Sequence, residues 1–263
     1  MSTVALPLVS VIMPAFNSVE YISAAIDSVL AQTLVEWELI VVDDASVDGT
    51  DEIVAAYARR DSRIKFYRLE RNAGAAFCRN LAIENSLGRF IAFLDSDDLW
   101  VTDKLQRQIQ LMLKNSWAFT YGSYRKIDEV GRDLGLVPAL ASVSYSKMLL
   151  GNFVGCLTAV YDTEVIGKVF MPAIRKRQDY GLWLSILKRV DRAYGIVEPL
   201  GFYRVRADSV SSNKIAAVAY TWRIYREVEG LSWARSVFCF ASYLFFTTLK
   251  NKFPALYRGG VRL

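Results

Sequence analysis

Residues 90–98 read FIAFLDSDD, so that five apolar residues run directly into three carboxylates within four positions. This pattern predicts a buried strand that delivers acids to its carboxyl end, the edge at which open α/β sheets bind their ligands. Carboxylates held close together raise each other's pKa, and a shared cation relieves that repulsion. Mg²⁺ and Mn²⁺ take oxygen ligands of this kind. We therefore expect an α/β fold whose sheet edge holds a cation and, through it, the phosphates of a nucleotide.

The residues before this stretch alternate strand and helix patterns. Short apolar runs predict strands, and apolar residues at helical spacing predict the intervening helices. Uninterrupted apolar strands separated by helices indicate a parallel sheet that is covered on both faces. The predicted strands are residues 8–13, stopped by Pro14, then 39–42, 64–69 and 90–94, and the predicted helices begin at residues 22, 51 and 75.

Beyond residue 102 the alternation becomes less regular. Thr102 is expected to cap an amphipathic helix. No repeat and no low-complexity linker follows, so we expect the second half to continue the same sheet and build an acceptor side. The predicted elements are strands at 118–127, 153–161 and 196–205 and a helix at 179–190, with a turn-rich segment at 128–135.

Composition excludes several classes of site. The chain of 263 residues carries 32 basic and 27 acidic side chains, and its net charge of +5 is too weak and too dispersed to argue for nucleic-acid binding. Histidine is absent, which removes the commonest catalytic base and the commonest zinc ligand. A general base must therefore be a carboxylate, a lysine, a tyrosine or a cysteine.

The three cysteines are expected to be buried and inert rather than catalytic. Cys78, Cys156 and Cys239 are scattered among apolar residues and form no paired motif, which indicates a reducing compartment. The first residues lack the pattern of a signal peptide, and no apolar run approaches the roughly 20 residues of a membrane span.

Three strand ends gather candidate binding residues. Residues 14–17 follow the first predicted strand, Asp43 and Asp44 end the second, and residues 95–97 follow the fourth. In a parallel sheet these ends lie on one side and can build one pocket. A carboxylate at the second strand end can accept a hydrogen bond from a nucleobase imide or a ribose hydroxyl. Acidic strand ends are also common as solvated turns, and Asp43 and Asp44 taken alone fit that interpretation equally well.

Together, four stretches resemble glycosyltransferase family 2. They are VSVIMPAFN at 9–17, VVDDAS at 41–46, NAG at 72–74 with Arg79 and Asn80, and FLDSDD at 93–98, and a weaker match continues with QDYGLW at 178–183 and with Tyr203-Arg204. The resemblance implies the GT-A fold, an α/β architecture with a Rossmann-like, mostly parallel central sheet and helices on both faces, here with a C-terminal helical tail. It also implies a nucleotide-diphospho-sugar donor, Mn²⁺ or Mg²⁺ as cofactor, and inversion of the anomeric centre.

The resemblance assigns roles position by position. Asp179 matches the catalytic base. Asp95 and Asp97 match the DxD signature and are the implied metal ligands, with Asp97 as the direct one, while Asp44 would contact the base of the nucleotide. The residues implied for nucleotide-sugar binding are Pro14, Ala15, Phe16, Asp43, Asp44, Asn72, Arg79, Asp95 and Ser96.

The acceptor and leaving-group side is less fully matched. Trp183 would lie near the acceptor. Where the family often has a second acid this chain has Gly181, and where many members have a metal-binding histidine it has Arg206. Arg204 or Arg206 would then supply positive charge to the leaving diphosphate directly. Other interpretations are open, because an Asp at the start of a helix such as Asp179 is usually a cap and a Trp at helical spacing is usually core.

The tail has a different character. Residues 236–249 carry no charge and are rich in aromatic side chains, and basic residues stand on either side of them. Such a segment is too short to span a bilayer; it lies either in a membrane interface or packed on the domain. We divide the chain into a transferase domain at 1–230, with a nucleotide-sugar-binding half at 8–115 and an acceptor-side half at 116–230, and a tail at 231–263.

The sequence therefore predicts an inverting glycosyltransferase that moves a sugar, with uridine diphosphate as the default carrier, to a glycan or polyprenyl-diphosphate-linked hydroxyl in bacterial polysaccharide synthesis. It is expected in the cytoplasm, at the inner face of the membrane. Two alternatives remain open. A haloacid dehalogenase-type phosphatase also has a strand followed by DxD, but there the motif ends the first strand. A non-catalytic scaffold on a transferase fold would explain the missing histidine and Gly181.

Overall fold

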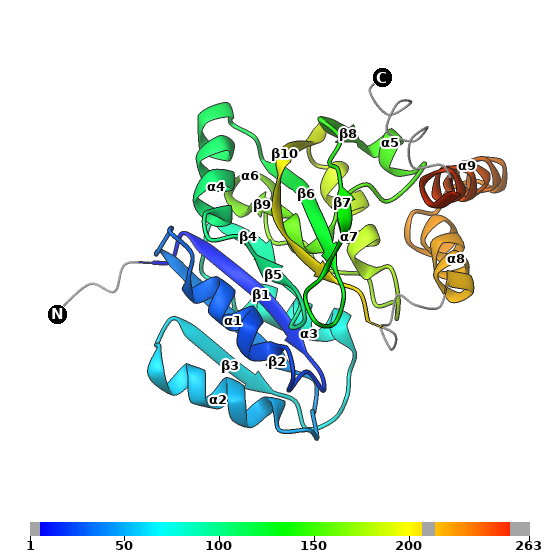
Figure 1. Cartoon of the computed structure of the whole chain (residues 1–263). Helices are drawn as coiled ribbons and strands as arrows, with labels where there is room; N and C mark the ends of the chain where they lie inside the picture. The colour runs from blue at the N-terminus through cyan, green and yellow to red at the C-terminus, as the bar shows by residue number, and fades with distance from the viewer. Residues whose placement is uncertain (1–5, 207–213, 253–263) are drawn as a thin grey trace.

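A central sheet with helices on both faces organises the chain in a computed structural model that describes residues 6–206 and 214–252 (Figure 1). Its strands run in the order β3-β2-β1-β4-β9-β6-β10-β5, with β7 on β6 and β8 on β10. The strands are β1 Val9–Ala15, β2 Trp37–Asp43, β3 Ile64–Arg68, β4 Phe90–Phe93, β5 Leu99–Trp100, β6 Phe119–Ile127, β7 Asp133–Val137, β8 Ser142–Ser144, β9 Val160–Asp162 and β10 Arg192–Arg204. The helices are α1 Ile22–Leu30, α2 Thr50–Arg60, α3 Ala75–Glu84, α4 Lys104–Asn115, α5 Tyr145–Met148, α6 Thr163–Ile166, η1 Cys156–Thr158, α7 Gln178–Leu187, α8 Lys214–Arg223, η2 Ile224–Val228 and α9 Trp233–Lys252.

The first half confirms the predicted α/β alternation. Strands β3, β2, β1 and β4 pair in parallel, with Ile12 of β1 opposite both Ile40 of β2 and Phe93 of β4. Their carboxyl ends therefore meet at one edge of the sheet, as the three acidic or polar strand ends require.

Pro14 does not end the first strand, contrary to the prediction. It lies inside β1, in register with Val42. Ile12 accepts a hydrogen bond from Leu94 on the β4 side, and Ala15 accepts one from Asp44 on the β2 side. Because backbone groups alternate sides along a strand, the nitrogen of Pro14 faces the β4 side, where pairing has already ended. The lack of an N–H at Pro14 therefore removes no hydrogen bond between strands.

The second half continues the same sheet in mixed directions. Strand β9 runs antiparallel between β4 and β6, and β10 pairs in parallel with β6 along most of its length. The predicted strand at 153–161 is wrong for most of its length, because η1 replaces its middle and β9 spans only Val160–Asp162. A short apolar run marks burial but does not by itself distinguish a strand from a buried turn. Thr102 is not the predicted cap either, since α4 begins after Asp103.

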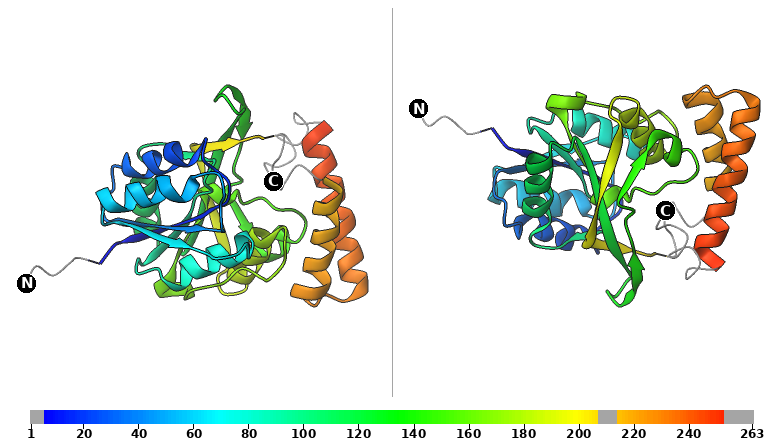
Figure 2. Two further views of the ribbon diagram at one scale, coloured as in Figure 1. Left: turned by 90° about the horizontal axis from the view of Figure 1, so that it is seen from below. Right: turned by 90° about the horizontal axis from the view of Figure 1, so that it is seen from above.

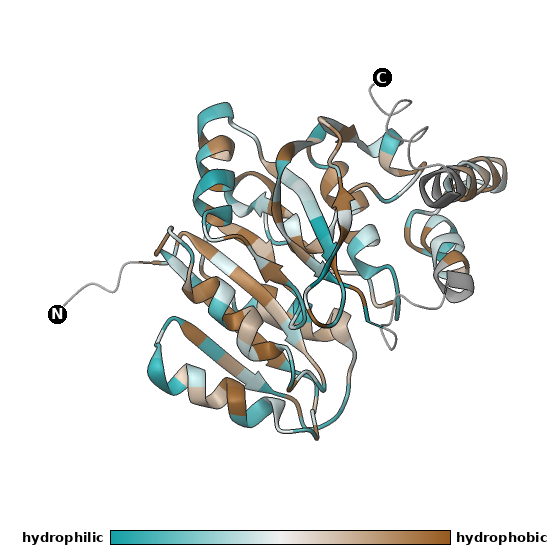
Figure 3. Ribbon diagram, in the orientation of Figure 1, coloured by the Kyte–Doolittle hydropathy of each residue, from teal (hydrophilic) through white to brown (hydrophobic). Residues whose placement is uncertain are grey.

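Alternation of side chains in β1 and its neighbours builds two cores, one on each face of the sheet. Val9, Val11 and Met13 pack with α1 and α4, while Ile12 points to the other face with α3 and α7. Figure 2 shows these helices on opposite sides of the sheet, and Figure 3 shows apolar colouring along β1 and β4. The two layers hold the strands rigid and leave their carboxyl ends to carry the site.

Helices α8, η2 and α9 lie together at one end of the molecule, on the side away from the N-terminus (Figures 1 and 2). They are fixed to the domain by polar bonds: the Tyr225 hydroxyl donates to the Leu149 carbonyl at 2.6 Å, and Lys188 forms an ion pair of 2.7 Å with the buried Glu229. None of the described helices is both long enough and apolar enough to cross a membrane.

Candidate active site

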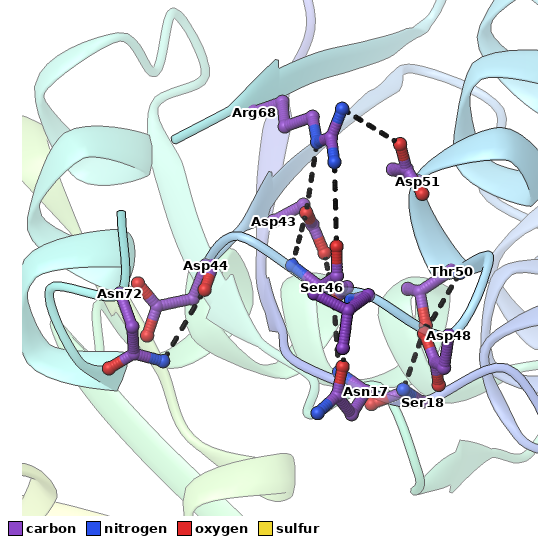
Figure 4. Close-up of polar contacts among 11 residues, drawn as sticks. Asn17, Ser18, Asp43, Asp44, Ser46, Asp48, Thr50, Asp51, Arg68 and Asn72 are labelled. Carbon is purple, nitrogen blue, oxygen red and sulfur yellow. Dashed lines mark hydrogen bonds and ion pairs between the residues drawn. The ribbon is translucent and has the colours of Figure 1, made fainter. Parts of the chain in front are cut away.

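Asp43 holds the turn that follows β2 rather than facing solvent. Its buried carboxylate accepts hydrogen bonds from the Ser46 amide, at 3.0 Å, and from the Ser46 hydroxyl. The same hydroxyl accepts from the amide of Asn17, at 2.9 Å, at the end of β1 (Figure 4). Asp43 therefore ties together two of the strand ends that were predicted to build the pocket.

Asp44 joins the β2 edge to the loop before α3. Its carboxylate accepts from the Ala73 amide at 2.6 Å and from the Gly74 amide at 2.9 Å, and its carbonyl accepts from the Asn72 side chain at 3.3 Å. Both carboxylate oxygens are thus engaged and little of the residue is exposed. A carboxylate has further lone pairs, so contact with a nucleobase through Asp44 stays a prediction.

The other predicted wall residues of the nucleotide site lie beside these turns. Ala15 is buried at the end of β1, whereas Phe16 directly after it is 49% exposed and presents its ring at the edge. Ser96 is buried and its hydroxyl lies 2.8 Å from that of Ser18.

Asp95 is paired with Arg79 across the edge between β4 and α3. Arg79 Nη2 lies 2.5 Å from Asp95 Oδ1, and Nη1 donates to the Gln178 side chain at 3.2 Å. Burial alone would lower the pKa of Arg79, but the charge and hydrogen bond of Asp95, together with the nearby Cys156 and Asp179, outweigh burial and the pKa is raised. The pair therefore links the acids after β4 to the first residue of α7.

Asp97 is paired with Arg206. Arg206 Nη1 lies 3.2 Å from Asp97 Oδ2, and its guanidinium stands over the ring of Tyr21 at 4.9 Å. Burial, and after it the charge of Asp95, raises the pKa of Asp97, while Arg206 opposes that rise. The side chains of Asp95 and Asp97 keep 31% and 25% of their surface exposed, so both remain within reach of a ligand.

Arg204 and Asp98 brace this acidic loop from beneath. The Arg204 side chain donates to the carbonyls of Asp97, Asp128 and Glu129, and its amide donates to the Asp98 carboxylate at 2.9 Å. Burial and the neighbouring acids raise the pKa of Asp98 well above its usual range. Arg204 is buried and its Nε and Nη1 donate to backbone carbonyls, so Arg206 is the arginine paired with a partly exposed acid of the loop.

Asp95 and Asp97 suit a divalent cation whose coordination is completed by a phosphate group. Among the described residues no three His, Cys, Asp or Glu side chains group as a self-sufficient metal centre. Two partly exposed carboxylates two positions apart, one of them with a raised pKa, are nevertheless the donor set that Mg²⁺ or Mn²⁺ takes when substrate phosphates and water supply the remaining ligands.

Asp179 opens α7 close to these groups. Its carboxylate accepts from the Asn152 side chain at 3.3 Å and is partly exposed. The Cys156 thiol lies within electrostatic range of Asp95, Arg79 and Asp179. Burial, and then the charge of Asp95, raises the pKa of that thiol well above its usual range, in agreement with an inert cysteine.

Comparison with known proteins identifies the arrangement. The sequence profile of glycosyl transferase family 2 matches residues 10–161. The chain belongs to this family. It is 44% identical over 238 residues to the putative teichuronic acid biosynthesis glycosyltransferase TuaG of Bacillus subtilis, a match that covers 90% of this chain and 94% of that protein. It is 43% identical over 221 residues to the UDP-Glc:alpha-D-GlcNAc-diphosphoundecaprenol beta-1,3-glucosyltransferase WfgD of Escherichia coli, with coverage of 82% and 85%.

Solved structures show the same fold. TarS of S. aureus in complex with UDP-GlcNAc aligns with a TM-score of 0.70 at 20% identity, over 97% of this chain and 78% of that one. The mannosyltransferase PcManGT of Pyrobaculum calidifontis, in complex with GDP-Man and Mn²⁺, aligns with a TM-score of 0.68 at 16% identity, over 98% and 74%. These structures confirm the predicted GT-A fold, and the family match and the relatives confirm the predicted transferase class.

Within this transferase Trp183 does not lie at the acceptor side, and that prediction is corrected. Its side chain has no exposed surface and packs edge-on against Phe93, with ring centroids 5.4 Å apart, and against Phe119 at the same distance. A fully buried indole between two aromatic rings is part of the core and presents nothing to a substrate.

Position 181 holds a glycine where the family often has a second acid, and in this transferase the reason is steric. A Cβ at this position would lie 2.6 Å from Cγ of Pro172. No side chain, acidic or otherwise, fits there without movement of the loop that carries Pro172. Sequence reasoning missed Gln178 and Asn152, which bind Arg79 and Asp179. Gln178 stands next to the predicted base, but nothing in the sequence marks Asn152.

Proposed function

We propose that this transferase moves a sugar from a nucleoside diphosphate, with inversion, to a hydroxyl of a glycan or of a polyprenyl-diphosphate-linked acceptor in the synthesis of a bacterial surface polysaccharide. Uridine diphosphate is the favoured carrier, because a carboxylate such as Asp44 suits the imide of uracil. The relative WfgD, whose name describes a UDP-glucose donor and a diphosphoundecaprenol acceptor, supports both choices.

One observation carries the proposal. Asp95 and Asp97 are each paired with an arginine, and Arg79 connects Asp95, at 2.5 Å, to the side chain of Gln178, at 3.2 Å, the residue before Asp179. Acids that can hold a diphosphate through a shared cation are thus linked to the helix turn that carries a carboxylate able to take a proton.

In the proposed reaction Asp179 Oδ accepts the proton of the acceptor hydroxyl, and the hydroxyl oxygen forms a bond to the anomeric carbon as the bond to the diphosphate oxygen breaks. The bound cation would stabilise the negative charge of the departing diphosphate. Arg206 adds a positive charge on the same side, and Asn152 orients the base. No histidine is needed for any of these steps.

The proposed place of reaction is the cytoplasmic face of the inner membrane, where a soluble donor and a lipid-linked acceptor meet. The transferase would reach it as a peripheral protein, with residues 231–263 as the contacting segment and no role for nucleic acid.

The test is a thermal-shift panel of UDP, GDP, CDP and dTDP, each with and without Mn²⁺, on the wild type and on Asp97→Asn. Stabilisation by UDP that requires Mn²⁺ and is lost in Asp97→Asn is the expected result, because a ligand stabilises only the state that binds it. Stabilisation by another nucleotide would show that this nucleotide, and not UDP, carries the donor sugar. No response to any nucleotide by folded protein would favour the non-catalytic scaffold.

A further inference from the structure

The outward face of α9 is apolar. Trp233, Val237 and Phe238 expose 66%, 54% and 66% of their surface, and Leu244 and Phe245 continue the same face with 37% and 63% exposed. The opposite face, with Cys239 and Tyr243, is buried against the molecule. A helix on the surface of a domain ordinarily turns its polar face outward, so this reversal marks an interaction surface.

The charge of the same segment is entirely positive. Residues 230–263 contain five basic residues, Arg235, Lys250, Lys252, Arg258 and Arg262, and no acidic one. Since the chain carries 32 basic and 27 acidic residues, the other 229 residues hold 27 of each and have no net charge. The whole positive excess of the protein therefore lies in this segment.

The inward face of α9 reaches the proposed active site. The Tyr243 hydroxyl accepts a hydrogen bond of 2.6 Å from Arg177 Nη2, directly before α7. Gln178, the next residue, binds Arg79, which in turn binds Asp95. The apolar face and the proposed reaction centre are thus joined through one helix.

We propose that the outward face of α9 docks on a bilayer that contains anionic phospholipid. Trp and Phe side chains favour the boundary between headgroups and acyl chains, and basic residues around them attract anionic lipid. Near Trp233, Arg226 stands over the ring at 4.7 Å and Arg235 is exposed, so both can reach lipid phosphate. The inference rests on the proposed function in one respect, that the acceptor is lipid-linked.

A second copy of the chain fits this face less well than a bilayer does. Pairing two α9 helices would bring together two helices that each carry three basic residues, Arg235, Lys250 and Lys252, and no acidic one. Like charges brought together in an interface oppose association, whereas an anionic bilayer neutralises them.

The experiment is flotation with vesicles of phosphatidylcholine alone and of phosphatidylcholine with phosphatidylglycerol. The test protein is the full chain with Val237→Glu and Phe238→Glu. The matched control carries Val165→Glu and Phe170→Glu, which replace side chains 63% and 47% exposed elsewhere on the molecule. Because all four positions are exposed, neither variant is expected to lose its fold, and circular dichroism checks this.

We expect the wild type and the control to float with the anionic vesicles, with a partition coefficient at least about tenfold above that of the α9 variant, and salt to weaken the binding. Equal flotation of the α9 variant and the wild type overturns the proposal. So does a wild type that fails to float but forms a dimer that the α9 variant lacks. Nucleotide stabilisation, measured on the same proteins, separates the two proposals, since loss of docking with intact UDP binding leaves the proposed reaction standing.

Discussion

Arg206 Nη1 lies 3.2 Å from Asp97 Oδ2, so a side chain of the protein occupies the carboxylate that the proposed cation would use. Both charges are partly exposed, with 26% and 25% of their side-chain surface accessible. A guanidinium and a divalent cation compete for the same oxygen, but a diphosphate can accommodate both, since it offers oxygens to each. Arg206 is therefore expected to weaken binding of the cation before the donor binds and to support binding of the cation afterwards.

Replacement of Arg206 by Gln should strengthen Mn²⁺ binding in the absence of nucleotide, by up to about fivefold, the range expected for loss of a partly exposed ion pair. Turnover should fall at the same time, because the leaving diphosphate loses a positive partner. Electron paramagnetic resonance of free Mn²⁺ measures the first effect and a transfer assay the second. Arg132→Gln, at an exposed position, is the control. Weaker Mn²⁺ binding in Arg206→Gln would contradict the competition.

Replacement of Asp179 by Asn should lower kcat by about 10² to 10⁴, the usual contribution of a positioned general base. The Asn152 contact at 3.3 Å can persist in part, so the geometry of α7 should hold. UDP-dependent stabilisation should be unchanged, since the base does not contact the donor nucleotide in the proposed reaction. Asp191→Asn, an exposed acid just beyond α7, provides the comparison. Unchanged turnover would remove Asp179 from catalysis.

The sheet and its acidic edge could be predicted because their signals are local. Residues 90–98 carry both the buried strand and its acids, and β1 and β2 show similar apolar runs. What could not be predicted depends on partners distant in the chain. Asp44 is engaged by backbone amides about thirty residues away, and Trp183 is enclosed by Phe93 and Phe119 from other strands.

Gly181 illustrates the same limit. Its place in the pattern suggests a lost acid, but the cause is the approach of Pro172 to 2.6 Å from where a Cβ would be. Family resemblance assigns residues to positions in a motif and says nothing of such packing. The pairing of Arg206 with Asp97 across 109 positions is likewise a property of the folded chain alone.

The Lys104 side chain is wholly buried, its amine has no hydrogen-bond partner in the described part of the chain, and this amine lies 3.9 Å from the centre of the Trp100 ring. Its replacement by Met keeps the volume and removes the unmet polar group. We expect the free energy of unfolding to increase by about 1 to 3 kcal/mol, the cost of a buried unsatisfied group. Urea denaturation of both proteins measures the difference, and a less stable Lys104→Met would show that the Trp100 contact outweighs that cost.

The pH dependence of the same pair of proteins gives a second check on Lys104. Burial lowers the pKa of Lys104 well below its usual value. Between the lowered pKa and about 10.4, the unfolded chain binds a proton that the folded chain does not, so the stability of the wild type should rise with pH across that window. Lys104→Met should lack this contribution. Parallel stability curves for the two proteins between neutral and alkaline pH would contradict it.

Replacement of Tyr243 by Phe should separate support of the catalytic helix from docking. It removes the hydroxyl that accepts the 2.6 Å hydrogen bond from Arg177, which has a left-handed backbone with φ of 64°. Arg177 Nε is already buried without a partner among the described residues. Loss of the hydrogen bond from Arg177 Nη2 to Tyr243 should therefore cost about 1.5 to 3 kcal/mol of stability. The outward face of α9 is untouched, and vesicle binding should match the wild type. If Arg177 holds the start of α7, kcat should fall while the affinity for UDP stays the same. A variant with normal kcat would show that Tyr243 fastens α9 without positioning Asp179.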